Sequence, residues 1–409
     1  MSSSIYSRCA LFILMLLSGC ACLDKADNLT EKRGTLVRIS SSPSLDVNAV
    51  NIAISVLHTG YGANTSVLPG NRYAVAIQRI VYKTLTPDGR LIDVSGVVAL
   101  PLKPAGKSSP LISYQHPTIL QDGYAPSTFA DPVMISLAGS GFIVAMPDYI
   151  GYATSTTELH PYLHAQSLAG TTVDMLRAAR QLLAQKNISD NGQLFLMGYS
   201  EGGYATLATQ KEMEQHLAAE FPLVASMPGA GPYDISGTAR YSVGLASNPV
   251  PELLGFFFKA YDFWYGWNSI NSIYKAPYNT VIATGYDGSI EQATLRAALS
   301  SDSATLFNST FRSGFLGGGE SAIKADIAKN DIYNWAPITP THLFHGQDDT
   351  IAPYANSTTA FAAMTKAGST SVVVINCTTP AGVRRDHFEC FGDYLSQEFA
   401  WFVPLAFNL

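Results

Sequence analysis

The sequence predicts an α/β fold in which a mostly parallel central sheet is flanked by helices. Two patterns indicate this class: an antiparallel hairpin near residues 73–101 and, after it, short apolar strands that alternate with helical segments. A third pattern, a dense run of aromatic residues late in the chain, predicts an inserted cap. The 409 residues are 47% hydrophobic and only 14% charged, which is the composition of a folded globular protein.

The hairpin consists of two alternating segments, AVAIQRIVYKTL at residues 74–85 and LIDVSGVVALP at residues 91–101, joined by the turn Pro87-Asp88-Gly89-Arg90. Short apolar runs then predict the buried strands of a parallel sheet. These runs are residues 111–114, 142–146, 194–197, 223–227, 343–344 and 372–375. Between the second and third runs, residues 167–186 fit a helix with one apolar face. That face carries Leu168, Thr172, Met175, Leu176, Ala179 and Leu183.

Residues 233–335 interrupt the alternation and contain 18 aromatic residues in 103 positions, against 11% in the whole chain. We predict that they form a cap inserted between residues 51–232 and 336–409, which would be the two parts of the core. Some of the rings must fill the interior of the cap. We expect others to line an apolar site.

Residues 1–19 are predicted to be a signal peptide, because the apolar stretch at residues 11–17 is too short to span a bilayer. Leu17-Ser18-Gly19-Cys20 resembles the bacterial lipobox, in which the cysteine is lipidated. The alternative is an ordinary signal peptide that is cut nearby. Residues 20–50 are polar and rich in serine, which suggests a tether. The protein is therefore expected to be exported, as an envelope lipoprotein anchored through Cys20 or otherwise in secreted form.

The net charge of −6, without any basic run, argues against a nucleic-acid partner. Of the five cysteines, Cys377 and Cys390 remain in the predicted folded part, where export would permit a disulfide. Such a bond would enclose His387. The sequence does not distinguish a restraint on His387 from general stabilisation of the loop.

The residues Gly198-Tyr199-Ser200-Glu201-Gly202 fit the pattern G-x-S-x-G. They follow an apolar strand directly and precede a run of good helix formers, which is the context of a nucleophile elbow. In such an elbow a sharp turn lifts the serine hydroxyl above the sheet. Ser200 is therefore the predicted nucleophile.

A serine hydroxyl needs a base, and that base needs an acid to orient it. The order nucleophile, acid, histidine that goes with this elbow requires a histidine late in the chain, which selects His387 in a polar loop after the last strand. His345 ends a strand and cannot fold back onto Ser200, while His160 and His164 suit ring packing or capping. Two carboxylates, Asp348 and Asp349, follow His345.

The oxyanion that forms during acyl transfer needs two backbone N–H donors. One is expected from Glu201, the residue after the nucleophile. The other is expected from the loop after residues 111–114, where Pro117 has no N–H. His116 is the preferred donor there, ahead of Gln115 and Thr118.

With these residues identified, the chain resembles the α/β-hydrolase superfamily over residues 73–409, and more narrowly the secretory lipase family typified by Candida antarctica lipase A. The segments that carry the resemblance are Ser113–His116 leading to Ala125–Ser127, Pro147–Tyr152, Gly198–Gly203, the long insertion, and His345–Pro353. The last segment resembles the HGxxDxxVP turn of many α/β-hydrolases, which assigns the acid to Asp349 and leaves Asp348 on the surface. Asp148 suits a structural role.

The resemblance implies an exported serine esterase or lipase that forms an acyl-enzyme on Ser200, with a cap that shapes an acyl tunnel and with no cofactor or metal. His116 and Glu201 stand where the family has an acidic and a small residue, which bears on substrate preference. The aromatic cap favours small-molecule or lipid esters with apolar acyl or aromatic groups, and no protein partner is indicated. The alternatives are a serine peptidase or acyltransferase on the same triad, and an inactive surface-binding lipoprotein.

Overall fold

The computed structural model describes residues 33–378 and 384–408. The predicted signal peptide, Cys20 and the first part of the predicted tether lie outside these residues. One nine-stranded sheet organises the chain, in the order β1-β2-β3-β5-β4-β6-β7-β8-β9. The strands are β1 Leu36–Ser41, β2 Val75–Leu85, β3 Leu91–Pro101, β4 Ser109–Gln115, β5 Ile143–Pro147, β6 Asp190–Tyr199, β7 Leu223–Gly229, β8 Thr341–His345 and β9 Val372–Asn376.

The sheet confirms the predicted fold class. Strands β2 and β3 form the predicted antiparallel hairpin, whose register runs without interruption from Val75 opposite Pro101 to Leu85 opposite Leu91. Strand β3 pairs antiparallel with β5, and from there to β9 every neighbouring pair is parallel. The carboxyl ends of these parallel strands therefore lie along one edge of the sheet.

The prediction of a tether as far as residue 50 was wrong for its last part. Residues 36–41 form β1, which pairs antiparallel with β2 at the edge of the sheet. Helix α2 (Val47–Tyr61) follows, and the carboxylate of Asp46 caps it by accepting a hydrogen bond from the Ala49 N–H. The serine-rich composition suggested a loose segment, but the free backbone edge of β2 provides hydrogen bonds that composition does not reveal.

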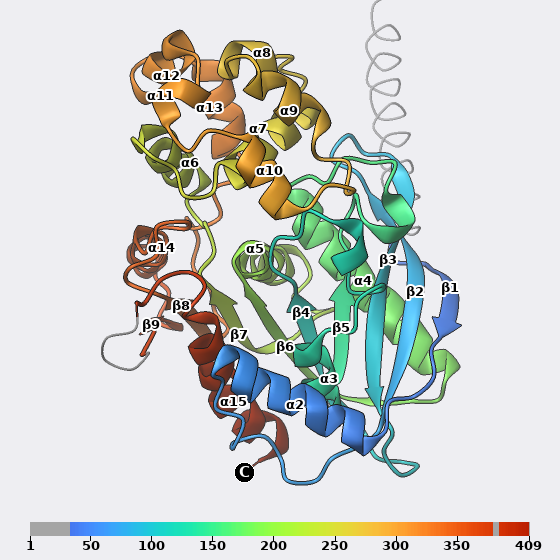
Figure 1. Ribbon diagram of the computed structural model, residues 1–409. Coiled ribbons are helices and arrows are strands. Elements are labelled where there is room, and N and C mark those ends of the chain that lie inside the picture. Colours follow the sequence, from blue (N-terminus) through green and yellow to red (C-terminus); the bar gives the residue numbers. More distant parts are fainter. Residues whose placement is uncertain (1–32, 379–383, 409) are drawn as a thin grey trace, which may run out of the picture.

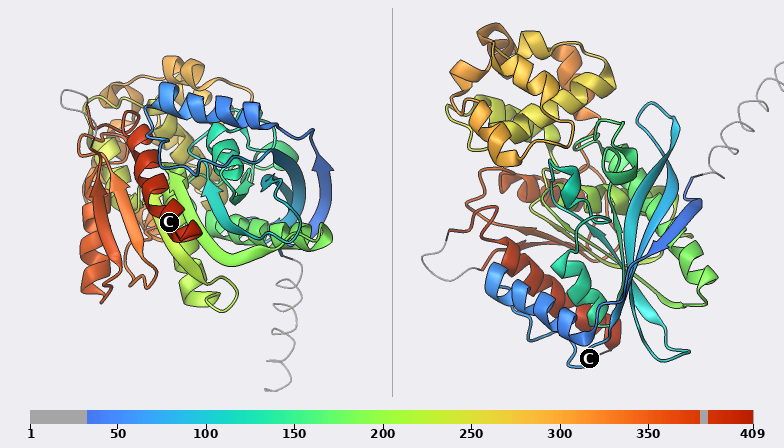
Figure 2. Two further views of the ribbon diagram at one scale, coloured as in Figure 1. Left: turned by 90° about the horizontal axis from the view of Figure 1, so that it is seen from below. Right: turned by 45° about the vertical axis from the view of Figure 1, so that its right-hand side comes forward.

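Helices cover both faces of the sheet. Helices α2, α3 (Pro132–Gly139) and α15 (Phe391–Phe407) lie on one face, with α2 beside α15, and the long helix α4 (Ala165–Gln185) lies on the other (Figure 2). Helix α5 (Glu201–His216) packs beside α4. The six residues predicted for the apolar face of α4 are all buried, which confirms that helix.

Helices α6 to α13 connect β7 to β8 and gather at one end of the molecule (Figure 1). Aromatic side chains fill the interior between these helices. There the ring of Phe258 on α7 contacts those of Tyr274, Phe307, Phe311 and Phe315. The helices are α6 Ile235–Gly244, α7 Pro251–Tyr265, α8 Ile270–Ile273, α9 Tyr278–Thr284, α10 Gln292–Ala298, α11 Ser303–Leu306, α12 Ser309–Leu316 and α13 Ser321–Ala328.

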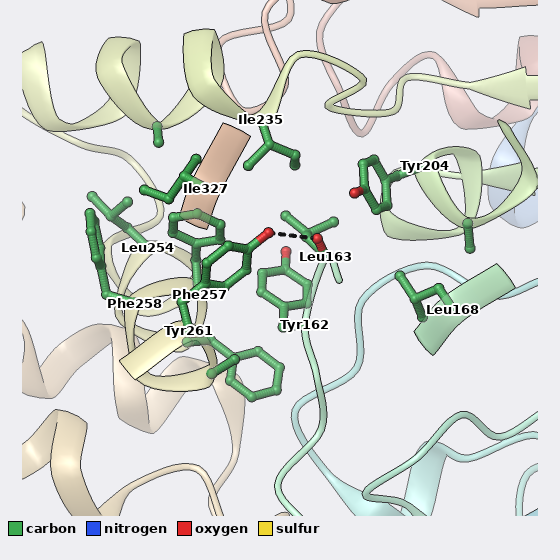
Figure 3. Packing of buried hydrophobic residues seen from close by; sticks show 14 of the residues in the cluster. Tyr162, Leu163, Leu168, Tyr204, Ile235, Leu254, Phe257, Phe258, Tyr261 and Ile327 are labelled. Atoms are coloured by element: carbon green, nitrogen blue, oxygen red, sulfur yellow. Dashed lines mark hydrogen bonds between the residues drawn. The ribbon is translucent and has the colours of Figure 1, made fainter. Parts of the chain in front are cut away.

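Helix α7 is tied to the segment that precedes α4. The Tyr261 hydroxyl donates a hydrogen bond of 2.8 Å to the Leu163 carbonyl oxygen (Figure 3), and the Trp264 indole N–H donates one of 3.2 Å to the Leu159 carbonyl oxygen. The exact limits of the cap at residues 233 and 335 stay a prediction. Across the described ranges, none of the helices is both long and apolar enough to cross a membrane.

Candidate active site

Ser200 lies in a sharp turn between β6 and α5. Its backbone has φ 60° and ψ −123°, a combination that is strained for a residue with a side chain. The Ser200 N–H donates a hydrogen bond of 2.8 Å to the Gly229 carbonyl oxygen, which holds the turn against β7. A Cβ atom on Gly202 would lie 2.0 Å from the Gln115 carbonyl oxygen, so only glycine lets α5 begin this close to the end of β4.

The three residues predicted to act together lie in one hydrogen-bonded chain. The Ser200 hydroxyl is 2.8 Å from Nε2 of His387, and Nδ1 of His387 is 2.6 Å from Oδ2 of Asp349. His387 and Asp349 are buried, whereas Ser200 is partly exposed. Because Nδ1 faces a carboxylate, it carries the hydrogen, which leaves Nε2 of the neutral ring free to accept a proton from the serine hydroxyl.

Asp349 is held by more than His387. Its Oδ1 accepts hydrogen bonds of 2.9 Å from the N–H groups of Ile351 and Ala352. Burial raises the pKa of Asp349, but attraction to His387 and hydrogen bonds from His345 and His387 outweigh it and hold the pKa well below its usual range. The carboxylate therefore stays ionised at neutral pH.

The neighbouring carboxylate of Asp348 and the imidazole of His345 form further hydrogen bonds beside this chain, and Nε2 of His345 also lies 3.3 Å from Oδ2 of Asp349. Asp348 is exposed, and its Oδ2 accepts a hydrogen bond from the Arg385 N–H. The Nε2 of His345 lies 2.7 Å from the Ala352 carbonyl oxygen, and its Nδ1 lies 2.8 Å from the Ser357 hydroxyl. The structure thus brings Asp349, and not Asp348, to His387, and it directs His345 away from Ser200.

The loop that carries His387 is fixed from two sides. The Tyr199 hydroxyl, next to the nucleophile, donates a hydrogen bond of 2.7 Å to the His387 carbonyl oxygen. Cys377 and Cys390 form a disulfide that closes the segment around His387. The hydroxyl of Tyr394 accepts a hydrogen bond of 2.8 Å from the Gly198 N–H, so helix α15 also supports the turn.

The two residues expected to bind the oxyanion both lie beside this turn. Glu201 is the first residue of α5, and the ends of β4 and α5 touch at Gln115 and Gly202. His116 is buried, and burial lowers the pKa of its imidazole. Its Nδ1 is 2.8 Å from the Pro117 carbonyl oxygen. Which backbone N–H groups receive an oxyanion stays a prediction.

Asp148 has the structural role expected for it. Its carboxylate accepts hydrogen bonds from the Ser127 N–H at 2.7 Å, from the Ser127 hydroxyl at 2.5 Å and from the Ser95 hydroxyl at 2.6 Å. His164 caps α4 by accepting a hydrogen bond from the Ser167 N–H, as expected. Within the described residues, no group of three or more histidine, cysteine and acidic side chains is arranged to hold a metal ion.

A pocket of about 600 Å³, including space open to solvent, extends from Ser200 into the cap. Its walls are mostly apolar and come from both parts of the molecule. Ile235, Ala239, Leu254 and Phe257 contribute from α6 and α7, and Ile351 contributes from the turn after β8. Ile235, Leu254 and Phe257 belong to one cluster of buried side chains together with Tyr162 and Leu163 (Figure 3). Such a pocket suits an apolar group attached to the reacting atoms.

One buried contact beside Ser200 was not predicted from the sequence. Nε2 of His160 lies 2.6 Å from Oε1 of Glu201, and both side chains are almost fully buried. His160 was expected only to pack or to cap a helix. No spacing rule links two residues that lie 41 positions apart, so only the fold reveals this pair.

Comparison with known proteins shows which family and which structures this chain resembles. The secretory lipase family matches residues 123–251. The rice cell wall degrading esterase LipA from Xanthomonas oryzae has a similar structure, with a TM-score of 0.81 and 26% identity over 91% of this chain and 99% of that protein. This chain has the α/β-hydrolase fold. Candida antarctica lipase A in its closed state shares the fold, with a TM-score of 0.65 and 16% identity over 92% of this chain and 82% of that one.

No curated protein sequence matches this α/β-hydrolase significantly. The resemblance to secretory lipases that the motifs indicated is confirmed, since that family matches the segment that contains the elbow. The family and the esterase structure together support a hydrolase of the lipase or esterase type. The description of the family as secretory agrees with the expected export.

Proposed function

We propose that the protein is a serine carboxylic ester hydrolase that cleaves esters of apolar acyl or aromatic groups. The observation that carries this proposal is the chain of hydrogen bonds from Ser200 through His387 to Asp349, which begins at an apolar pocket. An ester whose acyl group occupies the pocket would have its carbonyl carbon near the serine hydroxyl.

In the proposed reaction, Oγ of Ser200 attacks the ester carbonyl carbon while its proton passes to Nε2 of His387. The ionised Asp349 stabilises the imidazolium that forms, and the N–H groups of Glu201 and His116 bind the oxyanion. His387 then donates the proton to the leaving alkoxide, which departs as the alcohol. Water then attacks the acyl carbon while Nε2 of His387 takes its proton. The bond from the acyl carbon to Oγ of Ser200 breaks, His387 returns the proton to Oγ, and the carboxylic acid leaves.

The experiment is hydrolysis of a p-nitrophenyl ester series from acetate to palmitate, with wild-type protein beside Ser200→Ala. Turnover should be lost in the variant, and the midpoint of thermal unfolding should stay nearly the same because only one hydroxyl is removed. Labelling by an organophosphonate should be lost as well. Residual turnover equal to wild type would refute Ser200 as the nucleophile.

The outcomes also separate the alternatives. If folded wild-type protein reacts with the phosphonate but hydrolyses no member of the series, a peptidase or an acyltransferase on the same residues gains support. If it does not react with the phosphonate at all, a binding protein on an inactive hydrolase frame is favoured.

We further propose that the protein is exported as a lipoprotein anchored through Cys20, because the residues before it resemble a lipobox. The disulfide between Cys377 and Cys390 agrees with an oxidising compartment. Cell fractionation of wild type and Cys20→Ala tests this proposal. The variant should move from the membrane fraction to the soluble fraction, and an unchanged distribution would contradict lipid anchoring.

A further inference from the structure

The buried pair of His160 and Glu201 shares one proton. Nδ1 of His160 is 2.7 Å from the Ile150 carbonyl oxygen, and since a carbonyl oxygen only accepts, Nδ1 carries a hydrogen. Nε2 is 2.6 Å from Oε1 of Glu201, a distance at which two lone pairs would repel. A proton therefore lies between these two atoms. Whether the histidine or the acid holds it, the pair is neutral as a unit.

Among the described residues, His160 is the one side chain that forms an ion pair with Glu201. In the described part of the chain, no lysine or arginine forms an ion pair with it. A charge on Glu201 would interact electrostatically with the titratable side chains of His116, Tyr149, Tyr152 and Tyr162. Burial raises the pKa of all three phenols and lowers the pKa of the imidazole, so these four groups are neutral at pH 7.

Aromatic residues of the cap pack against His160. The ring of Phe256 on α7 lies 5.8 Å from the His160 ring and stacks on Tyr162 at 4.7 Å. Tyr286 also stacks on Phe256, at 5.0 Å, and the Tyr162 ring lies 6.2 Å from the His160 ring, so aromatic rings border the histidine of the pair. The exposed fractions of the His160 and Glu201 side chains are 2% and 1%. At side chains this buried, an unbalanced charge acts strongly on its neighbours.

We propose that His160 is a positioning residue for the reaction at Ser200: by sharing its proton with Glu201, it fixes the first residue of α5 and keeps the start of that helix free of net negative charge. This inference rests on the proposed ester hydrolysis. The tetrahedral intermediate places a negative charge beside this helix start, where unpaired N–H groups favour anions. A carboxylate without its proton partner would oppose that charge.

The test compares His160→Gln, Glu201→Gln and the double variant in hydrolysis of the best p-nitrophenyl ester. His160→Gln leaves Glu201 without the shared proton, so above the pKa of that carboxyl kcat and kcat/KM should both fall on the order of tenfold to a hundredfold while KM stays within about threefold. The acidic side of the pH–rate profile of His160→Gln should also move to higher pH, because the additional negative charge near Ser200 favours the protonated form of His387. Each rate is divided by the concentration of sites that react with the phosphonate.

Glu201→Gln should lose less than about tenfold, because an amide at this position can donate a hydrogen bond to neutral His160 and adds no charge. The double variant is neutral as well and should recover most of the rate that His160→Gln loses. His216→Gln is the matched control: it removes a histidine that pairs with Glu212 on the exposed face of the same helix, 4.0 Å away. Its kcat should equal that of wild type.

Equal losses in both single variants with no recovery in the double variant would overturn the proposal, since that is the pattern of a purely structural contact. If His160→Gln does not fold, a loss greater than about tenfold in Glu201→Gln overturns it, and a smaller loss with an active double variant supports it. Failure of wild-type protein to react with the phosphonate would instead defeat the proposed function. The two failures are therefore distinguishable.

Discussion

Oδ2 of Asp349 lies 2.6 Å from Nδ1 of His387, and the other oxygen of the same carboxylate is held by the N–H groups of Ile351 and Ala352. The carboxylate cannot rotate without breaking two backbone hydrogen bonds. Because burial is outweighed by attraction to His387, the pKa of Asp349 lies below its usual range and the group is ionised wherever an esterase would work. The imidazole is therefore fixed in one tautomer.

This relationship predicts that Asp349→Asn loses far more activity than Asp348→Asn. An amide in place of Asp349 can donate a hydrogen bond to Nδ1 of His387. This stabilises the tautomer whose hydrogen is on Nε2, and in that tautomer Nε2 cannot accept the proton of Ser200. The expected loss in kcat is on the order of 10⁴. Asp348 is exposed and forms hydrogen bonds with the Arg385 backbone, so its amide variant should stay within a few-fold of wild type. Similar losses in the two variants, measured on one ester, would show that the acid is misassigned.

A second prediction concerns Glu398, a fully buried residue of α15. Within the described residues, neither carboxylate oxygen has a hydrogen-bond partner, and burial raises the pKa of this carboxyl well above its usual value. An acid whose pKa is raised in the fold is neutral there, while the unfolded chain ionises above about pH 4.3. The free energy of unfolding is therefore highest at low pH, where the carboxyl is protonated in both states. It decreases as pH rises from about 4.3 toward the pKa of Glu398 in the folded protein.

Glu398→Leu should consequently increase the free energy of unfolding at pH 8 by about 1–3 kcal/mol, and the gain should be smaller at pH 5. Urea denaturation at both pH values measures the difference. Glu212→Leu, at a side chain of α5 that is 42% exposed, is the control and should change stability little at either pH. A gain that is the same at both pH values would mean that Glu398 does not titrate differently in the two states.

The disulfide gives a third prediction. Cys377 and Cys390 are 13 residues apart and enclose His387, and a loop of this length contributes about 3 kcal/mol by restricting the unfolded chain. Replacing both cysteines by alanine should lower the free energy of unfolding by that amount. At temperatures far below the unfolding midpoint, it should also reduce kcat several-fold. The loop that carries His387 would then be held by the Tyr199 hydrogen bond but no longer by the disulfide.

Reduction of wild-type protein should reproduce both effects, and the double alanine variant should not respond to the reductant. An unchanged kcat at low temperature, together with a lower unfolding temperature, would show that the disulfide only stabilises the loop in general. This measurement separates the two roles that the sequence left open.

Two of the predicted site residues have signals that can be read along the chain. Ser200 stands in a five-residue motif between a strand and a helix, and His387 follows from its place after the nucleophile and the acid in chain order. Asp349 required a family resemblance, because the chemistry of Asp348 is the same. The hairpin was predicted for a similar reason, since the alternation and its turn are contiguous.

The features that the sequence did not reveal depend on contacts between distant segments. Strand β1 exists because the edge of β2 offers hydrogen bonds, although the residues around it are serine-rich. The contact of Tyr394 with Gly198 joins positions 196 residues apart, and the pair of His160 and Glu201 joins a loop to a helix start. No local pattern records either contact, because each is made by the packing of the sheet, its helices and the cap.

The last prediction concerns the apolar pocket. Ala239 of α6 is buried and lines the pocket that starts at Ser200, so Ala239→Phe should fill the space where the end of a long acyl chain would lie. Excluding about three methylene groups from burial would cost on the order of 2 kcal/mol, or roughly thirtyfold in kcat/KM. The loss should appear for palmitate and be small for acetate, which shifts the optimum of the p-nitrophenyl series to shorter esters. Ala298→Phe, on the exposed face of α10, is the control and should leave the whole profile unchanged. An equal loss for every ester would mean that the added ring disturbs the cap rather than the acyl site.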